Sequence, residues 1–260
     1  MTDASALERL LHRDRVVAVA ALTGVALMSW LYLFLGAGMD AHDMDAMLSP
    51  SMTLHWSATY FTVMLLMWVI MMLAMMLPSA SPMILLHATI SRRRREQGGV
   101  LAATGIFALG YVVIWAAFGL AATFLQWALA AAALLSPAMA LTSKIAAASM
   151  LIAAGAYQWT PLKQSCLRRC RSPLDFVLAY WREGAWGSFS MGARHGAFCL
   201  GCCWLLMMLL FVGGLMNMLW IGGLAVFVLV EKMMPWGHWL GRVAGLALVF
   251  WGCVALATVI

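Results

Sequence analysis

Long apolar segments, separated by short charged connections, occupy most of this 260-residue chain. Only 10% of the residues are charged and 65% are hydrophobic, whereas about one quarter of the residues in a soluble domain are charged. A chain in lipid must satisfy its own backbone hydrogen bonds, so such segments cross a bilayer as helices. The sequence therefore predicts one all-α domain, a polytopic transmembrane helix bundle, with no separate soluble domain.

Seven of these segments are candidate spans, and their helix period and composition set their bounds. They are residues 16–36, 60–78, 101–127, 141–159, 197–212, 218–230 and 238–259. Pro78 and Pro82 are expected to end the second span, because proline lacks the backbone N–H that a helix interior needs. The sixth is short for a span of about 20 residues, so six spans is the alternative count.

The basic residues alternate between the two sides of this layout. The net charge of +6 comes from 16 Lys and Arg against 10 Asp and Glu, and its distribution follows the positive-inside rule instead of suggesting nucleic-acid binding. We therefore expect a cytoplasmic N-terminus at residues 1–15, an outer loop at residues 37–58 without Lys or Arg, and a basic cytoplasmic loop at residues 160–196. The expected location is a bacterial inner (plasma) membrane, crossed several times.

The second span carries six thioethers within MLLMWVIMMLAMMLP. At the helical period Met64, Met67, Met71 and Met75 share one face, and Met72 and Met76 lie beside it. Thioether sulfur is a soft ligand that suits Cu(I). The alternative is that these methionines are flexible side chains that fill an apolar core.

The outer loop mixes thioether, imidazole and carboxylate groups. Its candidate ligands are His42, Met44, Met47 and His55. Imidazole suits Cu(II), Zn and Ni, while thioether suits Cu(I). The loop is thus a candidate for metal capture, with an acidic, solvated loop as the alternative.

A first cysteine pair, Cys166 and Cys170, lies in CLRRC within the basic loop. On a helix this spacing puts both thiols on one face. The neighbouring arginines are expected to lower the pKa of both thiols and favour thiolate. Metal transfer, redox sensing and inert thiols all remain open for this pair.

A second cysteine group lies in HGAFCLGCCWLLMM, where His195, Cys199, Cys202 and Cys203 can share a helix face. Three cysteines within five residues, with a histidine one turn before them, indicate a soft-metal site. Cys253 is solitary and is expected in the core.

Two charged residues, Glu231 and Lys232, end the sixth candidate span. We expect them to form a pair whose long side chains reach the membrane interface.

Several of these segments resemble a known family. MMLAMMLPSASPM, TPLKQSCLRRCRSPLDF and HGAFCLGCCWLLMM, with LMNMLWIGG and EKMMPWG after them, are similar to the signature segments of a bacterial family of uncharacterised, predicted metal-binding integral membrane proteins. The resemblance covers roughly residues 60–250 and implies metal binding in a membrane. The Met-xxx-Met steps Met67/Met71 and Met71/Met75 are also similar to the motif of copper-uptake channels, which are much smaller proteins.

The soft ligands are expected at successive depths of the membrane, which is the arrangement an ion needs to enter and leave. We therefore expect a protein that binds Cu(I), or another soft or borderline transition metal, and transports or delivers it across the inner membrane. A metallochaperone or a membrane enzyme is an expected partner, and a homo-oligomer is compatible with the sequence. A membrane metal-dependent oxidoreductase, or a subunit or assembly factor of one, is the alternative.

Overall fold

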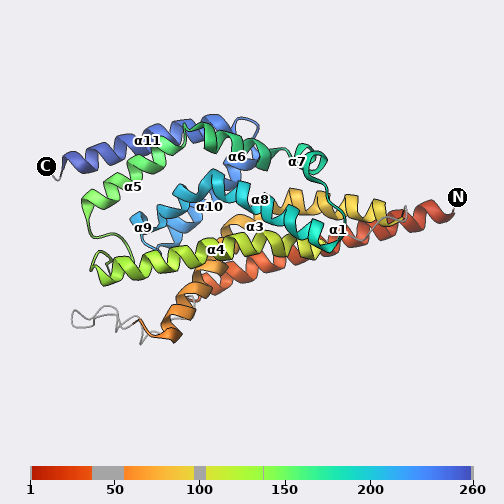
Figure 1. Ribbon diagram of the computed structural model, residues 1–260, viewed down its shortest axis with the longest axis horizontal. Coiled ribbons are helices and arrows are strands. Elements are labelled where there is room, and N and C mark those ends of the chain that lie inside the picture. The colour runs from red at the N-terminus through yellow and green to blue at the C-terminus, as the bar shows by residue number, and fades with distance from the viewer. Residues whose placement is uncertain (1, 37–55, 97–103, 137, 259–260) are drawn as a thin grey trace.

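The computed structural model describes residues 2–36, 56–96, 104–136 and 138–258, and the regular elements in these ranges are helices (Figure 1). In chain order they are α1 (Thr2–Phe34), α3 (Ala58–Glu96), α4 (Thr104–Ala131), α5 (Lys144–Tyr157), α6 (Pro161–Arg171), α7 (Pro173–Tyr180), α8 (Gly184–Met208), α9 (Leu210–Gly213), α10 (Met218–Met233) and α11 (Gly237–Ala257). The all-α prediction is confirmed. The candidate ligands His42, Met44, Met47 and His55 lie outside the described residues.

Within the described ranges, five helical segments are long and apolar enough to cross a membrane. They lie in α1, α3, α4, α8 (continued through α9) and α11. The fourth and sixth predicted spans form shorter helices, because α5 has 14 residues and α10 has 16, whereas a span needs about 20. The structure thus supports a membrane protein with five long helices and does not confirm the count of seven spans.

α3 continues through both of its prolines, so the prediction that Pro78 and Pro82 end it is wrong. Proline removes a backbone donor and leaves a carbonyl free. Pro82 leaves the carbonyl of Pro78 free, and Ser81 Oγ donates to it at 2.8 Å; Ser79 Oγ, beside Pro78, donates to the carbonyl of Met76 at 2.8 Å. Neighbouring hydroxyls of this kind allow a membrane helix to tolerate proline.

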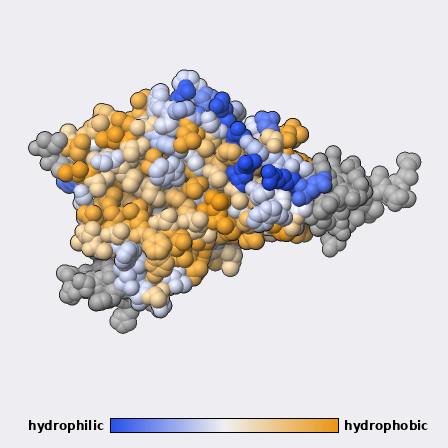
Figure 2. Space-filling view, in the orientation of Figure 1, coloured by the Kyte–Doolittle hydropathy of each residue, from blue (hydrophilic) through white to orange (hydrophobic). Residues whose placement is uncertain are grey.

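The segment predicted as a basic loop, 160–196, is mostly helical: it forms α6, α7 and the first half of α8. Thr160 Oγ1 accepts a hydrogen bond from the N–H of Lys163, and Pro161 occupies the first turn, where its missing N–H costs nothing. In the space-filling view, hydrophilic side chains gather near α6 and α7, and hydrophobic ones cover most of the same face (Figure 2).

α3, α4, α8 and α10 pack around the core, with α1 against α3 and with α5 paired to α11 on the opposite side in the view (Figure 1). α4 and α8 approach closely at glycines. A methyl group added to Gly110 would overlap the carbonyl oxygen of Phe189, and one added to Gly192 would overlap that of Phe107. Small residues of this kind let membrane helices come together without a gap.

This close approach predicts different outcomes for two glycines of α4. Gly110→Ala should destabilise the fold by about 1–3 kcal/mol, as overpacking does. Gly105→Ala, where nothing lies within 4 Å, should be neutral or stabilising by up to about 1 kcal/mol, since alanine is the better helix former. Thermal unfolding of the detergent-purified variants measures the difference. Equal melting temperatures for both variants would show that the two helices do not meet at Gly110.

Candidate metal centre

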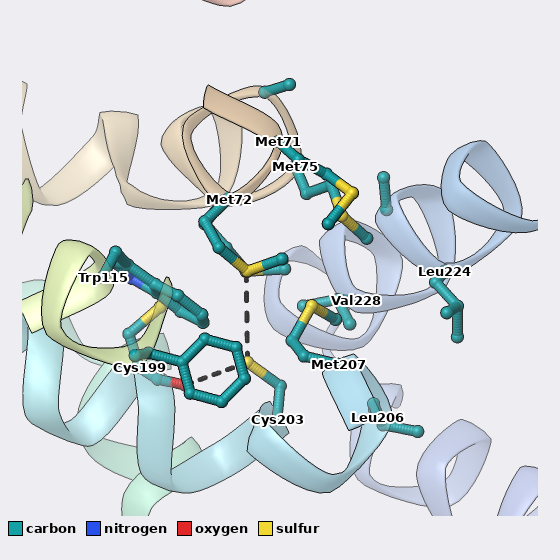
Figure 3. Packing of buried hydrophobic residues seen from close by; sticks show 14 of the residues in the cluster. Met71, Met72, Met75, Trp115, Cys199, Cys203, Leu206, Met207, Leu224 and Val228 are labelled. Atoms are coloured by element: carbon teal, nitrogen blue, oxygen red, sulfur yellow. Dashed lines mark hydrogen bonds between the residues drawn. The ribbon is translucent and has the colours of Figure 1, made fainter. Parts of the chain in front are cut away.

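The methionines of α3 are all inside the protein. Their exposed fraction is at most 1%, and this holds for Met64, Met67, Met71, Met72, Met75 and Met76. The protein covers both the predicted stripe of α3 and the side that carries Met72 and Met76. All six methionines are therefore equally buried. Met71, Met72 and Met75 point into the space between α3, α8 and α10, where Met207 and Cys203 of α8 also lie (Figure 3).

The methionine segment meets the cysteines of α8 near Met76. Cys203 Sγ lies 4.0 Å from Met76 Sδ. Tyr111 of α4 contacts both helices, since its hydroxyl lies 3.1 Å from Cys199 Sγ and donates to the carbonyl of Met76 at 3.3 Å. We call Met76, Cys199 and Cys203 the Cys–Met cluster. These contacts place Met76, the last methionine of the segment, against Cys199 and Cys203.

The side chain of Lys232 points into the Cys–Met cluster. Its amino nitrogen lies 2.9 Å from Cys199 Sγ, 3.8 Å from Met76 Sδ and 4.0 Å from Cys203 Sγ, and it also contacts Ser79 Oγ at 3.3 Å. The expected interfacial pair is therefore wrong, because both Lys232 and Glu231 are buried. A cationic nitrogen thus occupies the position at which three sulfur atoms converge.

The cysteine pair of α6 lies beside the cysteines of α8, because α6 packs on α8. A methyl group on Gly201 would lie 2.8 Å from Cys166 Sγ, so the absence of a side chain there admits this thiol. Hydrogen bonds from Cys170 to Cys199 and Cys202 raise the pKa of the Cys170 thiol well above its usual value. All five cysteines of the two motifs therefore lie in one region.

The expected thiolate character of the α6 pair is not found. Burial raises the pKa of the Cys166 thiol, Cys202 raises it further, and Arg169 offsets only part of this. The thiols of α8 also behave as donors, because Cys202 Sγ and Cys203 Sγ each donate to the carbonyl of Cys199 at 3.0 Å. These thiols must lose their protons before they can serve as strong metal ligands.

His195 lies one turn before Cys199 and is only 3% exposed. Its ring stacks near Tyr111, with centroids 5.8 Å apart, and its Nδ1 has no hydrogen-bond partner in the described part of the chain. A buried polar atom without a partner is uncommon and calls for an explanation. A metal ion brought to this side of Cys199 would supply one.

Within the described ranges, no three His, Cys, Asp or Glu side chains are placed so that they could hold a metal ion. The sulfur atoms that meet between α3 and α8 are thioethers and thiols. Cys253 is exposed on α11, so its expected core position is wrong. Sequence reasoning also missed Tyr111 and assigned Lys232 to the surface, because a single polar residue in an apolar helix does not reveal which neighbour it faces.

A buried ion pair supports the same region. Lys163 of α6 contacts Glu231 of α10 at 2.7 Å, both side chains are fully buried, and Lys163 also donates to Gln158. Glu231 directly precedes Lys232, so this pair fixes the end of α10 from which Lys232 reaches the sulfur atoms. Two charges removed from water are tolerated only as a pair.

The pair predicts a double-mutant result. Lys163→Met alone leaves the Glu231 carboxyl buried without its partner and should cost about 3–5 kcal/mol of stability. Lys163→Met with Glu231→Leu should recover most of that loss, since an apolar pair of similar volume replaces a desolvated one. Thermal unfolding and the yield of monodisperse protein check both variants. A single variant that is as stable as the double variant would contradict the assignment.

A family model described as "PpoB2: Copper chaperone" matches residues 65–255, which include the methionine segment after Met64 and both cysteine motifs. No curated protein and no solved structure matches the chain. The resemblance seen in the sequence is therefore confirmed as membership of a copper-related family. The chain belongs to the PpoB2 copper chaperone family.

Proposed function

We propose that this protein binds Cu(I) inside the membrane and delivers or transports it across the bacterial inner membrane. One observation carries the proposal: a buried line of thioethers on α3 ends at the thiol groups of α8. Thioether and thiolate select Cu(I) over hard cations, which prefer oxygen. The family description supports copper as the cargo.

The arrangement suits an ion that must leave again. Met64 and Met76 are twelve residues apart on one helix, which is about 18 Å at 1.5 Å per residue. Met67, Met71, Met72 and Met75 lie between them and are equally buried. Several weak sites in series allow an ion to move, whereas one strong site would trap it.

Lys232 contributes to weak binding at the Cys–Met cluster. Its amino group contacts the same sulfur atoms that would bind Cu(I), so the ion must displace a cation to enter. This competition keeps the affinity low enough for release. A metallochaperone or a copper-dependent membrane enzyme is the expected recipient, and thiols of α6 beside the cluster, Cys166 and Cys170, are the candidates for handing the ion on.

The ligands can be tested by measuring copper binding to detergent-purified protein, with ascorbate present and a Cu(I) chelator as competitor. The double variant Cys199→Ser/Cys203→Ser should bind the ion at least about tenfold more weakly, since losing even an outer-shell partner costs 10–100-fold in metal affinity. Cys253→Ser, which changes an exposed thiol on α11, is the matched control and should leave the affinity unchanged. Wild-type protein that binds no Cu(I) would refute the proposal.

A further inference from the structure

A second group of sulfur atoms converges near the other end of the methionine segment, on a buried amide. Gln126 of α4 points its Nε2 at two thioethers, Met64 Sδ at 3.4 Å and Met139 Sδ at 3.2 Å. The four side chains that form this group, the Gln126 cluster, are at most 4% exposed: Met64, Trp68, Gln126 and Met139.

The orientation of the amide is fixed by its other neighbour. Trp68 Nε1 can only donate, and it does so to Gln126 Oε1 at 2.8 Å. The amide nitrogen is therefore the atom that faces the sulfur atoms. Its N–H groups donate to the two thioether sulfur atoms. Thioether sulfur is a weak hydrogen-bond acceptor but a good ligand for soft cations.

Met139 reaches this position from the connection between α4 and α5, and its backbone is unusual. It has a φ of +55°, a left-handed conformation that residues other than glycine adopt infrequently. The connection holds it there, since the N–H of Met139 donates to the Ser136 carbonyl at 2.8 Å and Leu141 N–H donates to the Phe211 carbonyl at 2.7 Å. A strained backbone thus brings one loop thioether against a helix thioether, both out of contact with solvent.

The Gln126 cluster repeats the pattern of the Cys–Met cluster. In each cluster, sulfur atoms from different elements converge on one nitrogen that carries N–H donors. This nitrogen is Gln126 Nε2 in the Gln126 cluster and Lys232 Nζ in the Cys–Met cluster. An N–H donor directs positive charge at the sulfur lone pairs, as a bound cation would. The sulfur atoms of both clusters thereby have an N–H partner, and both clusters offer two or more sulfur atoms once the nitrogen moves aside.

We infer that the Gln126 cluster is a second binding site for a soft monovalent cation, Cu(I), held by Met64 and Met139. Hard cations are excluded, because no carboxylate belongs to the cluster and thioethers do not suit them. The site stands at the opposite end of the α3 methionines from Cys199 and Cys203, so it is the point at which the ion enters or leaves the line of thioethers. This inference rests on the Cu(I) function proposed above.

The experiment titrates detergent-purified protein with Cu(I), in the presence of ascorbate and a competing chelator, and counts bound ions. Wild type should bind two ions with different affinities. Met139→Leu conserves the volume of the side chain. This variant should bind the weaker ion at least about tenfold less tightly, as when an outer-shell partner of a metal site is lost. It should bind the tighter ion as wild type does. Cys199→Ser/Cys203→Ser should do the reverse. Met83→Leu, a buried methionine of α3 outside both clusters, is the control and should keep both ions.

A gain of affinity distinguishes ligation from packing. Gln126→Met replaces the competing amide with a third thioether and should tighten the weaker ion about tenfold or more. X-ray absorption at the copper edge in the Cys199→Ser/Cys203→Ser background should then show an all-sulfur environment. A merely structural amide would give no such gain.

The outcomes separate the two proposals. A wild type that binds one ion, lost only when Cys199 and Cys203 change, would overturn the second site and leave the Cu(I) function standing. Two ions in Met139→Leu with unchanged affinities would overturn it as well. A wild type that binds no Cu(I) would refute both.

Discussion

The hydroxyl of Tyr111 joins the three helices that form the candidate metal centre. It donates to the carbonyl of Met76 in α3 and lies 3.1 Å from the thiol of Cys199 in α8, while its own backbone belongs to α4. α4 and α8 lie close enough for this contact because glycines line their interface. The same carbonyl of Met76 also accepts from Ser79 just after Pro78, so the α3 turn at the proline is held by the side chains that surround the sulfur atoms.

Polar groups in this apolar interior are few, and four of them near the candidate centre, Lys163, Glu231, Lys232 and Gln126, have specific partners, whereas His195 Nδ1 has none among the described residues. Lys163 and Glu231 neutralise each other, and Lys232 and Gln126 direct nitrogen at sulfur. In lipid an unsatisfied polar group is expensive, so such groups persist where they have a role. Here the two nitrogens that face sulfur mark the two ends of a buried thioether line, and the ion pair anchors one of them.

Much of the fold was predictable, because apolar segments of span length must form helices in a bilayer. The sequence located the methionine stripe and both cysteine motifs, whose side chains are of the kinds that suit soft metals. It failed at Pro78 and Pro82, where α3 continues and Ser81 Oγ donates to the carbonyl that Pro82 leaves free. The proline and the hydroxyl that offsets it are both local, but the sequence pattern does not show which way the hydroxyl points.

The sequence by itself determined the helical class, the soft-ligand chemistry and the one-face grouping of Cys199, Cys202 and Cys203, since helix period and side-chain type are local properties. Only the tertiary structure decided which sulfur atoms meet. Met76 and Cys203 are 127 residues apart, and α6 had to pack on α8 before Cys170 could reach Cys199. Lys232 and Gln126 acquired their roles in the same way. The direction of a buried polar side chain depends on the helices around it, and no local pattern encodes those neighbours.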